Sequence, residues 1–214
     1  MSSTVRDVMS THVIAAHASA TYKELAAMLH YQRVSAFPVV DEGNKVIGIV
    51  SETDLLAKAA LEGTVPETLQ SLPQQRERSR VSGLTAAELM TSPAVTIGPD
   101  APVRHAARLM YNKRVKRLPV VGDDGVLIGI VSRADVLSVY SKPDEAIRDE
   151  VTSELIRGHH LPDPGLVSVS VKDGIVTVAG KPETTEDGEN MVVAVRHMEG
   201  VVGVRDRLSY PQGE

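Results

Sequence analysis

The sequence predicts an α/β chain with α+β character, made of two similar units and a small third unit of a different pattern. Three observations predict this fold class: an ungapped internal repeat, the same succession of strand and helix patterns in both copies, and a different pattern after residue 141. A chain of 214 residues is long enough to bury more than one core. Because 42% of the residues are hydrophobic and only 3% are aromatic, we expect aliphatic cores.

The internal repeat determines the architecture. The segment RVSAFPVVDEGNKVIGIVSETDLL (33–56) aligns with RVKRLPVVGDDGVLIGIVSRADVL (114–137) at a constant offset of 81 residues. The first unit then spans residues 4–62 and the second spans 86–141. Residues 63–85 are polar and contain two prolines, which favours a solvated linker over an RNA-binding basic run.

Each copy predicts the order β-α-β-β-α. A short extended segment precedes an amphipathic helix such as residues 22–33, which a strand around Pro-Val-Val, a glycine-containing turn and a second strand follow. The last helix begins at the serine of the GIVS sequence. A three-stranded sheet with helices on one face leaves apolar surface exposed, so we expect the two copies to pack together pseudo-symmetrically.

The third unit, residues 142–214, predicts the order α-β-β-α-β. A helix begins at the proline of residues 143–156, and residues 166–180 alternate strictly around an Asp173-Gly174 turn, a strong hairpin signal. A second helical pattern over 184–198 leads into a last strand within 199–210.

The repeats resemble the CBS domain. The marks are a hydrophobic-x-x-hydrophobic-Pro-Val-Val run at 34–40 and 115–121, and a G-h-h-S-x-x-D run, where h is hydrophobic, at 48–54 and 129–135. Two copies in tandem resemble a Bateman module, which implies a regulatory pair that binds AMP, ADP, ATP or S-adenosylmethionine in the cleft between its repeats. The resemblance also implies a homodimer.

The third unit resembles a BON domain, from VSVSVKDGIVTVAG and HMEGVVGVRDRL. The whole arrangement is similar to that of bacterial CBS-BON proteins. BON domains often work in the cell envelope, sometimes at phospholipid surfaces.

Two serine and aspartate pairs are candidate ligand contacts: Ser51 with Asp54, and Ser132 with Asp135. Each stands where a strand passes into a helix, and a helix N-terminus favours phosphate. The aspartate can accept ribose hydroxyls, and the serine can donate to phosphate or ribose oxygens. The same spacing is close to a capping box, so a capping role stays open for both pairs.

Lys116 and Arg117 are candidate phosphate contacts, because the resemblance implies that basic residues here reach phosphates across the cleft. Arginine offers a planar fork and lysine a point charge. The first repeat has Ser35 and Ala36 at these places, so we expect the two clefts to differ in affinity. The alternative is two ordinary surface cations.

Thr96 is a weaker candidate, in a segment that matches the strand lining the adenine pocket in the family. Its hydroxyl could donate to a ring nitrogen, although packing is the commoner role of such a residue. His159-His160 favours a loop over a metal site, because no third ligand stands at suitable spacing. With no cysteine and no hydrolase, P-loop or zincin motif, we expect no enzyme activity, no metal and no tightly bound cofactor.

Charge is distributed unevenly. Residues 143–214 carry 14 acidic and 7 basic side chains, whereas residues 1–142 carry 14 acidic and 16 basic ones. The acidic third unit argues against nucleic acid or an anionic membrane as its partner and favours an unknown protein. No export signal or long apolar run is recognisable, so we expect a cytoplasmic protein.

The sequence therefore favours a sensor in which adenosine-nucleotide occupancy controls the BON domain. The alternative is a ligand-free dimerisation scaffold or adaptor whose BON domain binds a protein or a phospholipid surface.

Overall fold

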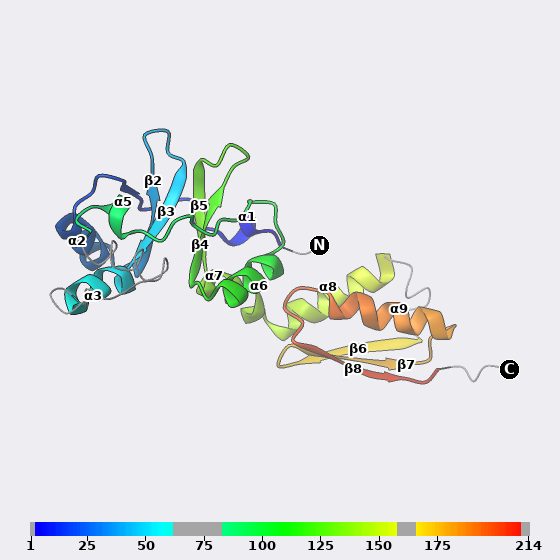
Figure 1. Cartoon of the computed structure of the whole chain (residues 1–214). Coiled ribbons are helices and arrows are strands. Elements are labelled where there is room, and N and C mark those ends of the chain that lie inside the picture. Colours follow the sequence, from blue (N-terminus) through cyan, green and yellow to red (C-terminus); the bar gives the residue numbers. More distant parts are fainter. Residues whose placement is uncertain (1–2, 62–82, 158–165, 211–214) are drawn as a thin grey trace, which may run out of the picture. The chain divides into compact units, whose positions relative to one another are not determined.

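The computed structural model describes residues 3–61, 83–157 and 166–210 (Figure 1). Its contacts divide the chain into two units. Residues 9–101 and 105–132 form one, and residues 1–8, 102–104 and 133–214 form the other. The strands of both repeats thus belong to the same unit, and each unit is considered by itself below.

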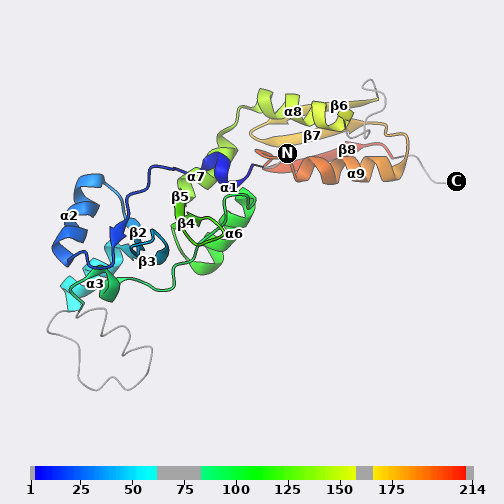
Figure 2. The same cartoon turned by 90° about the horizontal axis from the view of Figure 1, so that it is seen from above.

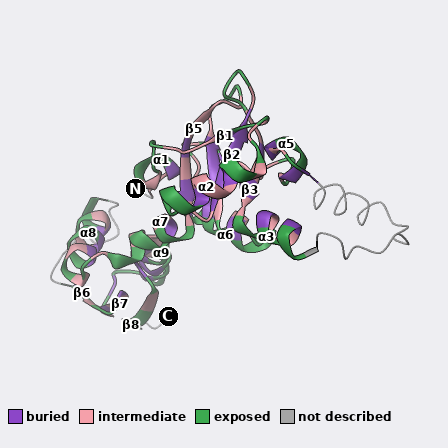
Figure 3. Cartoon of the chain, turned by 90° about the vertical axis from the view of Figure 1, so that its left-hand side faces the viewer, coloured by how far each residue is buried: buried purple, intermediate pink, exposed green. Residues whose placement is uncertain are grey.

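The first repeat has the expected order β-α-β-β-α, with one further short helix before it. Its three-stranded sheet runs β1-β2-β3, with β1 parallel to β2 and β2 antiparallel to β3. Strand β2 is buried along its whole length (Figure 3), and the aromatic Phe37 lies with Leu25 and Val50 in an otherwise aliphatic buried core. The elements are α1 (Val5–Val8), β1 (Ala16–His17), α2 (Tyr22–Gln32), β2 (Ala36–Val40), β3 (Val46–Ser51) and α3 (Glu52–Leu61), and α5 (Ala86–Leu89), which begins the second repeat, packs against the same core.

The second repeat has the same hairpin in the same register. Arg117 pairs with Ser132 as Ala36 pairs with Ser51, and both hairpins have an irregularity between their two final valines. The first strand that we expected is reduced to one parallel bridge between Ile97 and Val120. The elements are α6 (Val103–Lys113), β4 (Arg117–Val121), β5 (Leu127–Ser132) and α7 (Arg133–Ser138).

The two hairpins pair at their tips, which fixes one repeat against the other. The Leu127 N–H donates to the Asn44 carbonyl at 3.0 Å, and the Val46 N–H donates to the Gly125 carbonyl at 3.2 Å. Lys45 and Val126 form an antiparallel bridge between these bonds. Both hairpins belong to one unit, so the space between them is a defined part of the structure.

The third unit, residues 142–214, has the expected order α-β-β-α-β. Strands β6 and β7 are antiparallel, β7 and β8 are parallel, and α8 and α9 lie side by side over the sheet (Figure 2). Asp173 and Gly174 turn the hairpin with φ of 53° and 71°, and both N–H groups donate to the Asp144 carboxylate at 2.7 and 2.8 Å. The elements are the 3-10 turn η1 (Val139–Ser141), α8 (Asp144–Arg157), β6 (Val167–Lys172), β7 (Ile175–Gly180), α9 (Thr185–Arg196) and β8 (Gly203–Leu208).

Both helices cover the same face of this sheet. Ile147 and Leu155 of α8, and Met191 of α9, pack with Val176 and Val178 of β7 in one buried cluster. Among the described residues, no helix combines the length and the apolar character that crossing a bilayer requires.

Candidate functional site

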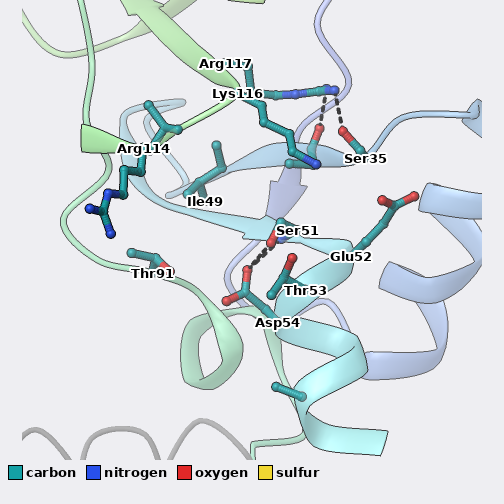
Figure 4. A pocket seen from close by; sticks show the side chains of 13 residues that line it. Ser35, Ile49, Ser51, Glu52, Thr53, Asp54, Thr91, Arg114, Lys116 and Arg117 are labelled. Atoms are coloured by element: carbon teal, nitrogen blue, oxygen red, sulfur yellow. Dashed lines mark hydrogen bonds between the residues drawn. The ribbon is translucent and has the colours of Figure 1, made fainter. Parts of the chain in front are cut away.

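A cavity of about 360 Å³ lies between the two repeats (Figure 4). This volume falls within the range of small-molecule pockets, roughly 300–1,000 Å³. The first repeat supplies the junction of β3 and α3, and the second repeat supplies the segment that leads from α6 into β4. The polar lining residues are Ser35, Ser51, Glu52, Thr53, Asp54, Thr91, Arg114, Lys116 and Arg117.

Ser51 and Asp54 lie together on the first-repeat wall. The Asp54 Oδ2 accepts from the Ser51 N–H at 2.8 Å and from the Ser51 Oγ at 2.7 Å. The bond from the Ser51 N–H is one of the two bonds of the capping box that the S-x-x-D spacing left open, with Ser51 at the end of β3 and Asp54 in the first turn of α3. The cap holds the carboxylate in the cavity wall.

Arg114 and Lys116 lie on the opposite, second-repeat wall. Arg114 follows α6 with φ of 56°, and Arg33 has φ of 52° at the equivalent place after α2. Arg114, in the left-handed conformation, ends α6, and the chain then continues into β4. Both cations are exposed, and Lys116 extends across the cavity toward the first repeat in Figure 4.

Arg117 is a half-buried bridge between the repeats. Its Nη1 donates to the Ala36 carbonyl at 2.8 Å, and its Nη2 donates to the Ser35 Oγ at 2.8 Å. The guanidinium thus joins the start of β4 to the start of β2. Of the two adjacent cations that the sequence singled out, Lys116 projects into the cavity and Arg117 holds its wall.

Thr91 lines the cavity because its backbone pairs with strand β3. Thr91 and Ile49 form an antiparallel bridge, with N–H to carbonyl distances of 2.9 and 3.1 Å in the two directions. Sequence reasoning missed Thr91, Thr53 and Arg114 as lining residues. Only Arg114 had a visible signal, because Arg33 repeats it at the offset of 81.

The other predicted site residues do not line this cavity. Thr96 is half-buried beside the Ile97 bridge, Ser132 ends β5, and Asp135 lies in the first turn of α7. Within the described ranges, no three histidine, aspartate or glutamate side chains are grouped to hold a metal ion. His159-His160 lies outside the described residues.

Two hairpins in one register, with a cavity that both copies line, define a paired-repeat module. The comparison with protein families gives it a name: the chain belongs to the CBS domain family, whose model matches residues 5–60 and 86–142, and a BON domain follows at residues 143–212.

Similar proteins share the repeat region. An uncharacterized protein of Methanopyrus kandleri is 31% identical over 147 residues, 69% of this chain and 67% of that protein. The chloroplastic CBS domain-containing protein CBSX1 of Arabidopsis thaliana is 30% identical over 128 residues, 55% of this chain and 54% of that protein. The chain therefore spans about two thirds of the first relative and about half of the second.

Two similar solved structures contain adenosine compounds. CBSX2 in complex with AMP has a TM-score of 0.57 at 31% identity, over 63% of this chain and 94% of that chain. The CBS domain pair of protein MJ0100, in complex with 5′-methylthioadenosine and S-adenosyl-L-methionine, has a TM-score of 0.53 at 27% identity, over 64% of this chain and 99% of that chain.

Proposed function

We propose that this chain is a regulatory module that binds an adenosine nucleotide in the cavity between its CBS repeats. The observation that carries the proposal is the pairing of two walls: Ser51 and Asp54 from one repeat face Arg114 and Lys116 from the other. The adenosine compounds in two similar CBS pairs support the ligand class.

The charges on the two walls favour one orientation of the ligand. Glu52 and Asp54 place two carboxylates in the first turn of α3, which disfavours a phosphate at that helix terminus. The phosphate would instead accept from Lys116 and Arg114, and the ribose hydroxyls would donate to Asp54. A carboxylate has about four acceptor positions, so capping α3 and binding ribose are compatible.

Arg117 would couple occupancy to the arrangement of the repeats. Its guanidinium lines the cavity while it donates to Ser35 and Ala36, so a ligand bound between the two walls would favour the arrangement of the repeats that these bonds hold. Ligand binding then regulates the chain only if it favours one arrangement of the repeats over another.

The remaining parts of the function are also proposals. The pair works as a homodimer in the cytoplasm without catalysis of its own, and the BON domain passes the signal to a protein partner. The rival proposal is a ligand-free scaffold. The cap at Asp54 and the Arg117 bridge favour it, because both satisfy cavity side chains from within the fold.

A thermal-shift panel separates these proposals. The panel contains AMP, ADP, ATP, S-adenosylmethionine, 5′-methylthioadenosine and GMP. A ligand that binds only the folded chain stabilises it by about 2.7 kcal/mol at one hundred times its dissociation constant. We expect a concentration-dependent rise in melting temperature with at least one adenosine compound and none with GMP. A flat response to the whole panel would favour the scaffold.

A further inference from the structure

The BON sheet has one face that the two helices leave uncovered. Val169 and Val171 of β6, Val176 and Val178 of β7, and Val204 and Leu208 of β8 face the helices. Because side chains alternate along a strand, the residues between them face the other way. These outward positions hold Ser168, Ser170, Lys172, Ile175, Thr177, Ala179, Gly203, Arg205 and Arg207.

This outer face is positively charged although the region is acidic. It carries three cations, three hydroxyls and no carboxylate at its outward strand positions. Helices α8 and α9 carry eight carboxylates on the opposite side. In the part of the chain that the structure describes, Lys172, Arg205 and Arg207 take part in no ion pair.

The register gathers two of the cations along one edge. Arg205 lies opposite Thr177, Arg207 lies opposite Ala179, and β8 is an edge strand of the described sheet. Residues two apart on one strand are separated by about 6.6 Å. In an extended segment that pairs with β8, alternate side chains have the same spacing. Alternate residues of that segment would therefore lie beside the two arginines on the outer face.

Asp206, between the two arginines, is held on the other face. It lies opposite the inward-facing Val178. Its carboxylate accepts from the Tyr210 hydroxyl at 2.5 Å and from the Leu208 N–H at 2.8 Å. The edge is therefore basic on its outer face and acidic on its helix face, which prescribes an alternating charge pattern for anything that pairs with it.

We propose that the β8 edge of the BON domain binds an extended protein segment with acidic residues at alternate positions and no acid between them. Arginine forks pair with carboxylates in two parallel bonds, and strand addition supplies main-chain bonds along β8 before Leu208, whose N–H already donates to Asp206. At its outward strand positions the face has no aromatic side chain on which nucleic-acid bases would stack, and Ile175 is the one large apolar side chain there that could insert into a bilayer. This inference is independent of nucleotide binding in the CBS pair.

The test uses the full chain and fluorescence anisotropy. The probe is a labelled nine-residue peptide with glutamate at alternate positions and threonine or valine between, and a control peptide of equal composition has its glutamates side by side. We expect the alternating peptide to bind at least tenfold more tightly. The double variant Arg205→Glu with Arg207→Glu should have at least tenfold lower affinity for this peptide. It should instead bind a peptide in which lysine replaces each glutamate.

A matched pair of charge changes provides the control. Arg157→Glu with Arg196→Glu changes the net charge by the same amount, but on the exposed surfaces of α8 and α9. This control variant should change the affinity for the peptide by less than about twofold. Equal binding of the two peptides, or equal losses in both double variants, would overturn the proposal. So would binding of the chain to phosphatidylglycerol vesicles that Arg205→Glu with Arg207→Glu abolishes, because that result assigns the face to a membrane.

Discussion

Lys116 is the cation that we propose as the main phosphate contact. Its neighbour Arg117 already donates to Ser35 and Ala36, whereas the Lys116 side chain extends into the cavity. A charged hydrogen bond is worth about 1.5 to 3 kcal/mol, which corresponds to roughly a tenfold to hundredfold change in affinity. We expect Lys116→Ala to lower the affinity for AMP by this factor and to leave the affinity for adenosine unchanged.

Isothermal titration of both ligands into the full chain measures this difference. Lys23→Ala is the matched control, because Lys23 is exposed on α2 and does not line the cavity. Equal losses of affinity for AMP and adenosine would show that Lys116 supports the fold of the site and does not contact the phosphate.

Arg117 should behave differently, since it joins the repeats. Removing its side chain leaves the Ala36 carbonyl and the Ser35 hydroxyl without their donors in a half-buried place. We expect Arg117→Ala to lower the free energy of unfolding by about 1.5 to 3 kcal/mol, and to weaken AMP and adenosine by similar factors. Urea unfolding and titration measure the two effects, and an unchanged unfolding midpoint would contradict the bridging role.

Caps at helix N-termini predict a dependence of stability on pH. Backbone and hydroxyl hydrogen bonds from Thr21 hold the pKa of Glu24 below its ordinary value of 4.5. Backbone hydrogen bonds from Leu84 and Thr85, with the Thr85 hydroxyl, lower the pKa of Glu88 in the same way. A carboxylate with a depressed pKa stabilises the fold above its unfolded value, and this contribution disappears as pH falls through the folded value.

Stability should therefore fall as pH decreases from about 5 toward 3, and Glu24→Gln should show a smaller fall. Thermal melting of both proteins across this range checks the prediction. Parallel curves for the two proteins would mean that the Thr21 and Glu24 cap contributes nothing in solution.

Gly180 and Gly203 give a contrast within the BON sheet. A Cβ added at Gly180 would lie 2.1 Å from the Leu166 carbonyl oxygen, and its φ is +136°, whereas nothing lies within 4 Å of a Cβ at Gly203. Backbone strain of this kind costs about 1 to 3 kcal/mol. We expect Gly180→Ala to lose at least that much stability in urea unfolding, and Gly203→Ala to change it by less than about 0.5 kcal/mol. Similar values for the two variants would contradict the close approach of the Leu166 backbone to Gly180.

The sequence predicted the element orders because each depends on local patterns. Alternation of apolar and polar residues and an Asp-Gly turn predict the β6-β7 hairpin. In the repeats, the constant offset of 81 residues predicts that β4-β5 forms the same hairpin as β2-β3. The missing strand of the second repeat was not predictable in this way. Its pairing with β4 is reduced to a bridge at Ile97, and strand length depends on contacts that are distant in sequence.

The candidate site was only partly predictable for the same reason. The motif resemblance selected Ser51, Asp54 and Lys116, which the fold brings to one cavity. Thr91 enters through its pairing with Ile49, 42 residues earlier in the chain, and no motif marks it. The family resemblance suggested a phosphate contact for Arg117, but its bond to Ala36, 81 residues earlier in the chain, was not predictable from any local pattern.

The arrangement of the repeats explains why one cavity combines opposite charges. Pairing between the hairpin tips places the acidic start of α3 from one copy against the basic segment before β4 of the other. Neither copy alone contains both walls. The central claim is that these two walls together bind one nucleotide.

Isothermal titration of AMP into the full chain tests this claim most directly, when it compares Asp54→Ala with Glu24→Ala. Both substitutions remove a carboxylate that caps a helix, but only Asp54 lines the cavity. We predict saturable binding to the unmodified protein and to Glu24→Ala, and a loss of at least tenfold in Asp54→Ala. No heat of binding with the unmodified protein, or equal affinity in all three, would contradict the claim.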